Sequence, residues 1–574
     1  MLIRFDFAQH DMHRTPVIQQ QTSKSMKKHI LTCFLGLLCL IGSELIAKSK
    51  VVDSPTEQEG ASTSAHSQAL IYGEISNPDS LGPLILTSSP FFVDAKSNFG
   101  KRINELETEG GNFFDGILNP RARKFSASVP LGDRAGYFSL AVGTRMLLDQ
   151  FLVLPGDSLK INLDLAGFDI SFGGPDAWFY EAQYAIRRER ERVVFDAPRQ
   201  LVLSSKSTIM TRDSNLQLMA EEEGKFGSEL LVQTGRTSLE RVVEELSYAD
   251  RELASTLDLL NFYSPYLDVS QVDLLKLELY SQYYFGKLKT IRNFHYEKLD
   301  SYYTEAEKAA FLQRLDRALV QISDAGYTDN SRLVSAFFLE MTVEKIMLES
   351  LIKRVGFKAQ VMENYQGELA DRVLAGFLSS YLGQYPNPEA VIDDYLKLME
   401  ENIWRSRVLS LRNAHVPGEE IMDMEMINLD GERVTSSVFE GKPTVLYVYF
   451  SSCTHSSEYF QSFLYPMYDS LKAKGYRLMA LSVDEDEALW RSQITRFSNP
   501  ELTNLNISGA GRESFIHYYE IFAFPKTILL DGDGKIRSLH LDGKTAEEQK
   551  SMLFNTLDSM KGESEILKPL TETK

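Results

Sequence analysis

The 574-residue chain has few cysteines and a deficit of positive charge. Its three cysteines are Cys33, Cys39 and Cys453, which excludes a disulfide-rich scaffold and a zinc-cluster protein. Lysine and arginine number 61 against 80 aspartate and glutamate residues, so the formal net charge is −19. Because an acidic chain repels phosphate backbones, we expect no nucleic-acid partner.

The rest of the composition is ordinary for a folded protein. Hydrophobic residues make up 43% and charged residues 25%, so the chain can bury sizeable cores and disorder is not expected. At roughly 100–200 residues per domain, the length predicts three or four domains.

The apolar run near the N-terminus resembles a secretory signal peptide, which we assign to residues 26–47. A basic start, Met26–His29, precedes the apolar run Ile30–Gly42, which is too short to cross a bilayer comfortably. We expect cleavage after Ala47 and export to the periplasm or outer cell envelope, with Met26 as the natural start after an upstream segment, 1–25. An uncleaved signal would instead tether the chain to the membrane.

Lipidation at Cys33 or Cys39 is a weaker alternative, because the preceding residues, Thr32 and Leu38, are not the small residue that processing usually requires. Removal of the signal leaves Cys453 as the only cysteine. A single cysteine in an exported chain cannot form an internal disulfide, so Cys453 is a candidate reactive thiol.

Hydrophobic periodicity changes along the chain and predicts its organisation. Residues 48–66 are a polar linker. Residues 67–168 contain short alternating apolar runs and the turn Pro155-Gly156-Asp157, which predict a small antiparallel β-sandwich. Residues 169–412 have helical spacing and predict an all-α middle domain. A β/α pattern covers 416–561, and 562–574 form a polar tail.

The middle region contains two candidate helix starts and many tyrosines. Thr237 with Glu240, and Thr304 with Glu307, have the spacing of a capping box. The tyrosines between Tyr263 and Tyr303 are dense enough for a peptide- or sugar-binding surface. Aromatic helix packing is the interpretation we favour, because aromatics at helical spacing usually fill cores.

The β/α region places Cys453 directly after a buried strand, 444–450, and before a helix predicted over 457–474. A second buried strand is predicted over 477–483, helices over 487–497, 510–519 and 545–560, and a hairpin from 527–531 to 535–541. A thiol at a helix N-terminus faces unpaired N–H groups and the positive end of the helix dipole. Both favour the thiolate, which is the species that exchanges with disulfides.

Here the sequence resembles the thioredoxin superfamily, and most closely its TlpA/ResA-type extracytoplasmic branch. The segment Tyr449–Ser456 is similar to the active-site loop of that family. Further segments agree in order and spacing, and the resemblance covers roughly 416–560: Pro417–Val434, Phe439–Pro443, Leu481–Asp486 with Trp490, and Tyr519–Asp531 with Gly534–Ile536. The front half is similar, less specifically, to the N-terminal extensions of such proteins from Bacteroidetes-type bacteria. The expected architecture is therefore multidomain, with a C-terminal thioredoxin-like α/β fold.

Two departures from the family pattern limit the chemistry. The family has Trp-Cys-x-x-Cys, whereas Ser452 replaces the tryptophan here and Ser456 replaces the second cysteine. The second cysteine normally attacks the mixed disulfide and releases the substrate, which a serine hydroxyl cannot do. A complete dithiol cycle within this chain is therefore excluded.

The resemblance also implies roles for three other residues. His455 stands where DsbA and protein disulfide isomerase have a histidine that stabilises the thiolate; the alternative is a polar residue on an exposed helix end. Pro525 would be the cis-proline facing Cys453, and Phe524 and Pro525 would receive the client's backbone. An ordinary turn proline is the alternative for Pro525.

Other chemistries find less support in the sequence. A peroxiredoxin loop requires Pro-x-x-x-Thr-x-x-Cys, but Leu446 and Phe450 occupy the proline and threonine positions. The remaining histidines lack metal-ligand spacing, so surface or packing roles are expected: His66, His295, His415, His517 and His540. The run Asp531–Gly534 lacks the later ligands of a calcium loop and predicts a turn. We expect no metal and no cofactor.

Two functions remain open from the sequence. In the first, Cys453 forms mixed disulfides with exported client proteins, and an external thiol reductant resolves them, with Cys453, His455 and Ser456 as the catalytic-site positions. In the second, the thioredoxin-like fold is redox-inert and binds a partner.

Overall fold

The computed structural model describes residues 67–76, 82–95, 97, 99–111, 122–143, 145–167, 169–197, 199–203, 213–227, 230–507, 509–521, 523–541 and 545–566. The chain divides into two compact units. One contains Glu105–Asn364 with the strands before Pro90, and the other contains Phe91–Asn104 and the chain from Tyr365 onward. The predicted helical region, 169–412, is thus divided between the units. The predicted signal peptide and linker lie outside the described residues.

The N-terminal region is strand-rich, as predicted. Its strands are β1 (Gln68–Ser76), β2 (Leu84–Ser89), β3 (Arg102–Leu106), β4 (Glu109–Gly110), β5 (Ala122–Pro130), β6 (Gly136–Val142), β7 (Arg145–Val153), β8 (Ser158–Asp164) and β9 (Asp169–Gly173). They form two sheets, with the orders β4-β5-β1-β8-β9 and β3-β2-β6-β7. β1 lies parallel to β8, so the prediction of a purely antiparallel arrangement is wrong. That the two sheets pack face to face as a sandwich stays a prediction.

One glycine explains how β1 and β8 approach each other. A Cβ atom built on Gly73 would lie 1.8 Å from the carbonyl oxygen of Ile161 on β8. Glycine is therefore required at this position, because any side chain would collide with the neighbouring backbone.

The middle region is helical, although it is not all-α. Its helices are α2 (Ala177–Asp196), α3 (Asp213–Phe226), α4 (Gly235–Glu245), α5 (Ala249–Glu252), α6 (Ala254–Tyr263), α7 (Val269–Thr290), α8 (Leu299–Tyr302), α9 (Glu305–Gln321), α10 (Asp329–Val334), α11 (Ala336–Lys353) and α12 (Phe357–Asn364). Two short strands, β10 (Arg199–Leu203) and β11 (Leu230–Thr234), pair in parallel. The prediction of an all-α region is therefore wrong. The apolar runs at 201–203 and 230–232 are short, and runs of this length are typical of strands rather than helices. None of the helices that the structure describes is long and apolar enough to span a membrane.

The two predicted helix starts have different outcomes. Thr304 caps α9 with a complete capping box, in which its side chain accepts from the Glu307 N–H and Glu307 accepts in return. The box at Thr237 and Glu240 is wrong. β11 leads directly into α4, which begins at Gly235, so Thr237 already lies inside the helix.

A buried histidine in the first unit predicts how stability depends on pH. The His295 side chain is fully buried, with Nε2 3.3 Å from Ser238 Oγ and Nδ1 3.4 Å from Tyr302 Oη. Burial, with a smaller contribution from Lys298, lowers the pKa of His295 to about 4. The stability that neutral His295 contributes is complete above the unfolded pKa and is lost as the pH falls from about 6.5 towards 4, by about 3 kcal/mol. Urea unfolding between pH 4 and 7 should show this loss, and the His295→Gln variant should lack it. An unchanged pH slope in the variant would contradict the assignment.

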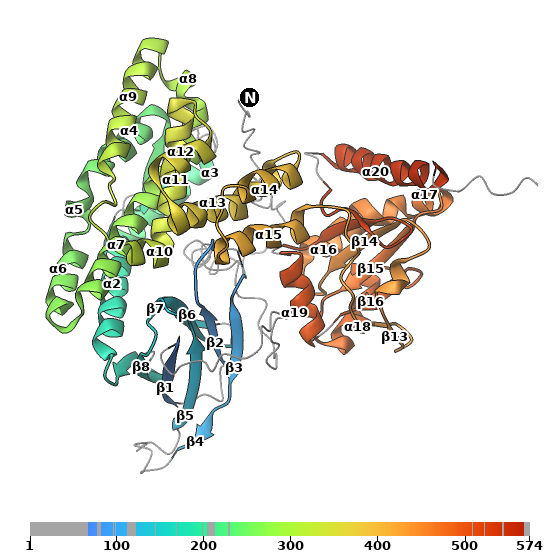
Figure 1. The fold of residues 1–574 in the computed structure, drawn as a ribbon, viewed down its shortest axis with the longest axis horizontal. Coiled ribbons are helices and arrows are strands. Elements are labelled where there is room, and N and C mark those ends of the chain that lie inside the picture. Colours follow the sequence, from blue (N-terminus) through green and yellow to red (C-terminus); the bar gives the residue numbers. More distant parts are fainter. Residues whose placement is uncertain are drawn as a thin grey trace, which may run out of the picture. The chain divides into compact units, whose positions relative to one another are not determined.

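From Tyr365 onward, the second unit contains the helices α13 (Gly367–Tyr381), α14 (Pro388–Leu396) and α15 (Ile403–His415). A mixed sheet follows, in the order β13-β12-β16-β15-β14-β17-β18, and Figure 1 labels its strands β13 to β16. Its strands are β12 (Met426–Asn428), β13 (Arg433–Val434), β14 (Thr444–Tyr449), β15 (Arg477–Ser482), β16 (Thr503–Asn506), β17 (Lys526–Leu530) and β18 (Ile536–Ser538). β14, β15 and β16 are parallel. Their carboxyl ends therefore meet at one edge of the sheet, where Cys453 follows β14.

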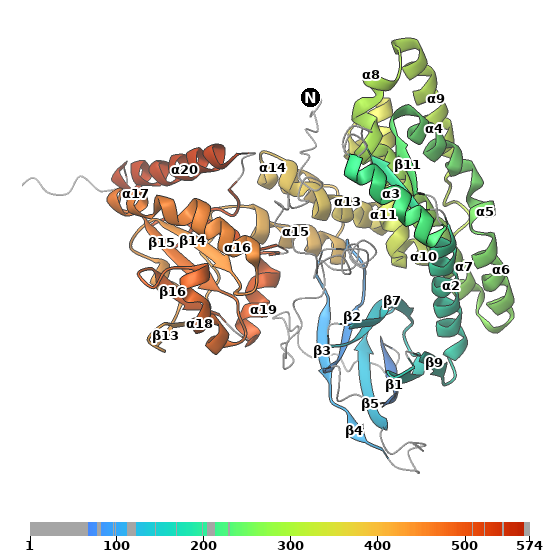
Figure 2. The same ribbon diagram turned by 180° about the vertical axis from the view of Figure 1, so that it is seen from behind.

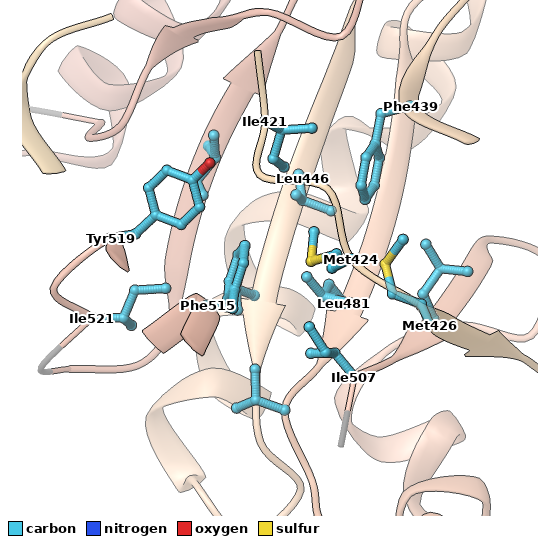
Figure 3. Packing of buried hydrophobic residues seen from close by; sticks show 14 of the residues in the cluster. Ile421, Met424, Met426, Phe439, Leu446, Leu481, Ile507, Phe515, Tyr519 and Ile521 are labelled. Carbon is cyan, nitrogen blue, oxygen red and sulfur yellow. The ribbon is translucent and has the colours of Figure 1, made fainter. Parts of the chain in front are cut away.

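Helices cover both faces of this sheet (Figure 2), and each face has its own buried hydrophobic core. On one face, Val445, Tyr447 and Tyr449 of β14 pack against side chains of α17 (Tyr468–Ala473), α18 (Glu487–Phe497) and α20 (Ala546–Ile566). On the other face, Leu446 and Val448 pack against α19 (Gly509–Tyr518) and the lead-in segment around Ile421 (Figure 3). β14 is buried along its whole length, as its continuous apolar sequence predicts.

The helix predicted over 457–474 is interrupted. α16 (Thr454–Tyr459) leads into a π-helical turn, Phe460–Leu464, and a 3-10 turn, Tyr465–Met467, before α17. Pro466 lies in the 3-10 turn. Because proline has no N–H to donate and its ring collides with the preceding turn, it interrupts the regular α-helical hydrogen bonding at this position.

Candidate active site

Cys453 lies at the junction between β14 and α16. It is the N-cap residue of α16, and its carbonyl accepts from the N–H groups of Ser456 at 3.0 Å and Ser457 at 3.3 Å. The side chain is partly exposed. The thiol is therefore held beside the first turn of α16.

The thiol faces the loop before β17. Cys453 Sγ lies 3.7 Å from the Phe524 carbonyl oxygen, and the Phe524–Pro525 peptide bond is cis. The rings of Phe450 and Phe524 meet edge to face, with centroids 5.1 Å apart. The structure thus brings Cys453, Phe524 and Pro525 together from two separate segments.

His455 has a more exposed position on the first turn of α16. Its side chain is 66% exposed, and Nδ1 lies 3.9 Å from the Glu458 carboxylate, one turn further along. Among the interactions of the described residues, none joins the imidazole to Cys453. Any effect of His455 on the thiolate would therefore act through space rather than through a hydrogen bond.

Ser456, which the sequence resemblance predicts at the position of a second cysteine, is fully buried. Its hydroxyl has no hydrogen-bond partner among the described residues, while its carbonyl accepts from Tyr447 Oη at 2.7 Å. Burial, together with the charges of Tyr449 and Cys453, raises the pKa of Tyr447 far above the ordinary value. Tyr447 therefore stays protonated and donates to the backbone beneath the thiol.

A buried carboxylate, which the sequence analysis did not single out, supports the loop that carries Cys453. Asp484 follows β15 and accepts from the Ser451 N–H at 2.8 Å, from the Ser451 hydroxyl, and from the Ser482 hydroxyl at 2.5 Å. Asn506, at the end of β16, donates to the Asp484 carbonyl at 2.9 Å. These residues come from the carboxyl ends of the three parallel strands. In the sequence, the pattern that could have revealed this network is a polar residue at or just after the end of each buried strand.

Comparison with known proteins covers the same part of the chain. Residues 417–539 match the model of the AhpC/TSA family. No curated protein matches the chain.

Similar solved structures each cover about a quarter of the chain. They include the thioredoxin domain of a thiol-disulfide oxidoreductase from Bacteroides vulgatus, at 22% identity over 25% of this chain and 98% of that chain, with a TM-score of 0.22. A thiol:disulfide interchange protein from Bacteroides sp. is 24% identical over 25% of this chain and 90% of that chain, with a TM-score of 0.22. A thiol-disulfide oxidoreductase from Bacteroides fragilis is 22% identical over 24% of this chain and 100% of that chain, with a TM-score of 0.21.

The family match, 417–539, spans the strands from β12 to β18. The C-terminal region of this chain is a thioredoxin-fold domain of the AhpC/TSA family.

Proposed function

We propose that the chain is a cell-envelope protein that exchanges disulfides through one thiol. The Cys453 thiolate attacks a disulfide in an exported client, forms a bond between the two sulfurs, and releases the client's other sulfur as a thiolate. An external thiol then attacks the mixed disulfide, bonds to the client's sulfur and restores Cys453. Each step exchanges one sulfur–sulfur bond for another, so no further oxidant is needed.

One observation carries the proposal. Cys453 is partly exposed at the start of α16, and its sulfur faces the Phe524 carbonyl beside Pro525 at 3.7 Å. A client strand that lies along Phe524 and Pro525 would bring its disulfide next to the nucleophile. Phe450 and Phe524 supply an apolar border on which such a strand could pack.

The single-thiol mechanism follows from Ser456. Because a serine hydroxyl cannot attack a disulfide, the mixed disulfide persists until an outside thiol arrives. In this proposal His455 and the helix N-terminus stabilise the thiolate, and Ser456 fills the space of the second cysteine. The expected signal peptide at 26–47 supports export, and removal of that segment leaves Cys453 as the only thiol.

The proposal is tested by following adduct formation with a cysteine-containing peptide disulfide. The protein should carry Cys33→Ser and Cys39→Ser, so that Cys453 is the only cysteine. Mass spectrometry should show one peptide adduct per chain, which reduced glutathione removes, and Cys453→Ser should form none. His455→Ala should form the adduct more slowly, by less than about tenfold, because the imidazole acts only through space.

Absence of any adduct at neutral pH would contradict the proposal. That result would favour the second function, in which the same loop binds a partner without redox chemistry.

A further inference from the structure

The helix that precedes the thioredoxin-fold domain, α15, contacts one side of the loop that faces the thiol directly and is linked to the other side through His540. We call this loop, through its described residues Ile521 and Ala523–Pro525, the thiol-facing loop. Glu520 precedes it, in the left-handed backbone region at a φ of 47°. Lys526 follows it as the first residue of β17.

On the first side, a buried ion pair joins α15 to Glu520. Arg407 donates to the Glu520 carboxylate, and the two side chains are only 2% and 10% exposed. The guanidinium also donates from Nε to Ser379 Oγ on α13 at 2.9 Å and lies 5.5 Å from the Phe99 ring centre. Because Arg407 is fixed by several partners, it holds Glu520 at a defined position.

On the second side, two histidines connect Lys526 to the end of α15. Lys526 Nζ lies 3.1 Å from His540 Nδ1, and the backbone of Ala414, at the end of α15, raises the pKa of the same imidazole, against the larger lowering effect of burial. The rings of His415 and His540 stack, with centroids 5.8 Å apart and an angle of 25° between the planes. Lys526 is thus linked to the last turn of α15, about two helical turns from Arg407.

We propose that α15 positions the thiol-facing loop relative to Cys453, with Arg407 on one side and His540 on the other as positioning residues. Phe524, whose carbonyl faces the thiol at 3.7 Å, lies between the two attachment points. Resting on the proposed function, this inference adds that client docking depends on a helix outside the thioredoxin-fold domain. If a client binds along the thiol-facing loop, disulfide exchange with that client should slow when α15 no longer holds the loop.

The first measurement does not depend on redox activity. Hydrogen exchange of the amides in 519–530 should become about tenfold faster in Arg407→Gln and in His540→Ala, while β14 should remain protected. Arg407→Lys keeps the charge and should restore most of the protection. Arg412→Gln is the matched control, because Arg412 lies on the same helix but pairs with Glu389 and Asp393. If Arg407→Gln fails to fold, Arg407→Met with Glu520→Gln removes both buried charges.

The second measurement separates positioning from general destabilisation. A peptide disulfide must dock on the loop, whereas cystamine is small enough to reach the thiol directly. In Arg407→Gln and His540→Ala, the adduct rate with the peptide should fall about tenfold relative to the rate with cystamine. An unchanged ratio of the peptide rate to the cystamine rate would overturn the inference, and so would unchanged hydrogen exchange of the amides in 519–530. If the unmodified chain reacts with neither disulfide, the proposed function fails, and hydrogen exchange alone decides whether α15 holds the loop.

Discussion

Replacing Ser456 with cysteine should convert the single-thiol site into a dithiol that closes an internal disulfide with Cys453. Ser456 lies on the first turn of α16, with its N–H 3.0 Å from the Cys453 carbonyl. Cys453 has the extended backbone of an N-cap residue, with φ −82° and ψ 104°, so the side-chain spacing within a helix does not apply to it. A disulfide requires the two Cβ atoms to lie within about 4.5 Å of each other, and we expect the tight turn from residue 453 to residue 456 to allow this. The Ser456 hydroxyl is buried without a partner among the described residues, so the less polar thiol suits the position.

The expected change is large because an internal thiol competes at a high effective concentration. Mixed disulfides of Ser456→Cys should disappear on the order of 100-fold faster than those of the unmodified site. Both proteins should carry Cys33→Ser and Cys39→Ser. Oxidised glutathione should then leave one glutathione adduct on the chain that keeps Ser456. The Ser456→Cys chain should lose both thiols and retain no adduct.

Ser457→Cys is the matched control for this prediction. Ser457 directs its hydroxyl to the Arg496 carbonyl at 3.0 Å, away from Cys453, so its variant should keep the glutathione adduct. A stable adduct together with a free thiol in Ser456→Cys would mean that residue 456 does not approach Cys453.

Replacing Asp484 with alanine should strongly destabilise the thioredoxin-fold domain. The carboxylate accepts from the Ser451 N–H, from the Ser451 hydroxyl and from the Ser482 hydroxyl, all of them buried. Because hydrogen bonds to a charged group contribute roughly 1.5–3 kcal/mol each and their loss leaves buried donors unpaired, we expect a loss of about 3 kcal/mol or more. This loss of unfolding free energy can be measured by urea unfolding that is monitored through hydrogen exchange of the amides in β14 and β15.

Asp486→Ala provides the comparison two residues away. Asp486 is exposed and caps α18 by accepting from the N–H groups of Ala488 and Leu489, so its loss should cost about 1 kcal/mol. Equal losses in the two variants would show that the Asp484 network is not the main support of the loop. Asp484→Ala should also slow adduct formation, because Ser451 stands two residues before Cys453.

The sequence was sufficient for features that depend on local patterns. The buried strand β14, the helix Glu487–Phe497 and the Thr304 capping box each follow from residues close together in the chain. The approach of Cys453 to Phe524 came from the family resemblance, because no periodicity connects segments that are 71 residues apart.

The remaining features depend on contacts between distant residues. Asp484 and Ser451 are 33 residues apart, and Arg407 and Glu520 are 113 apart. Neither pair has a local spacing that would reveal it. Thr237 shows the opposite failure: its spacing to Glu240 fits a capping box, but β11 leads into α4 before that position.

The most direct test of the account is the rate at which iodoacetamide alkylates Cys453 at pH 6, compared with free cysteine. In the proposed function the Cys453 thiolate is stabilised at the start of α16, and the sulfur is partly exposed, so the Cys33→Ser, Cys39→Ser chain should react about tenfold faster. A rate equal to or below that of free cysteine would contradict the claim that this thiol is activated for exchange.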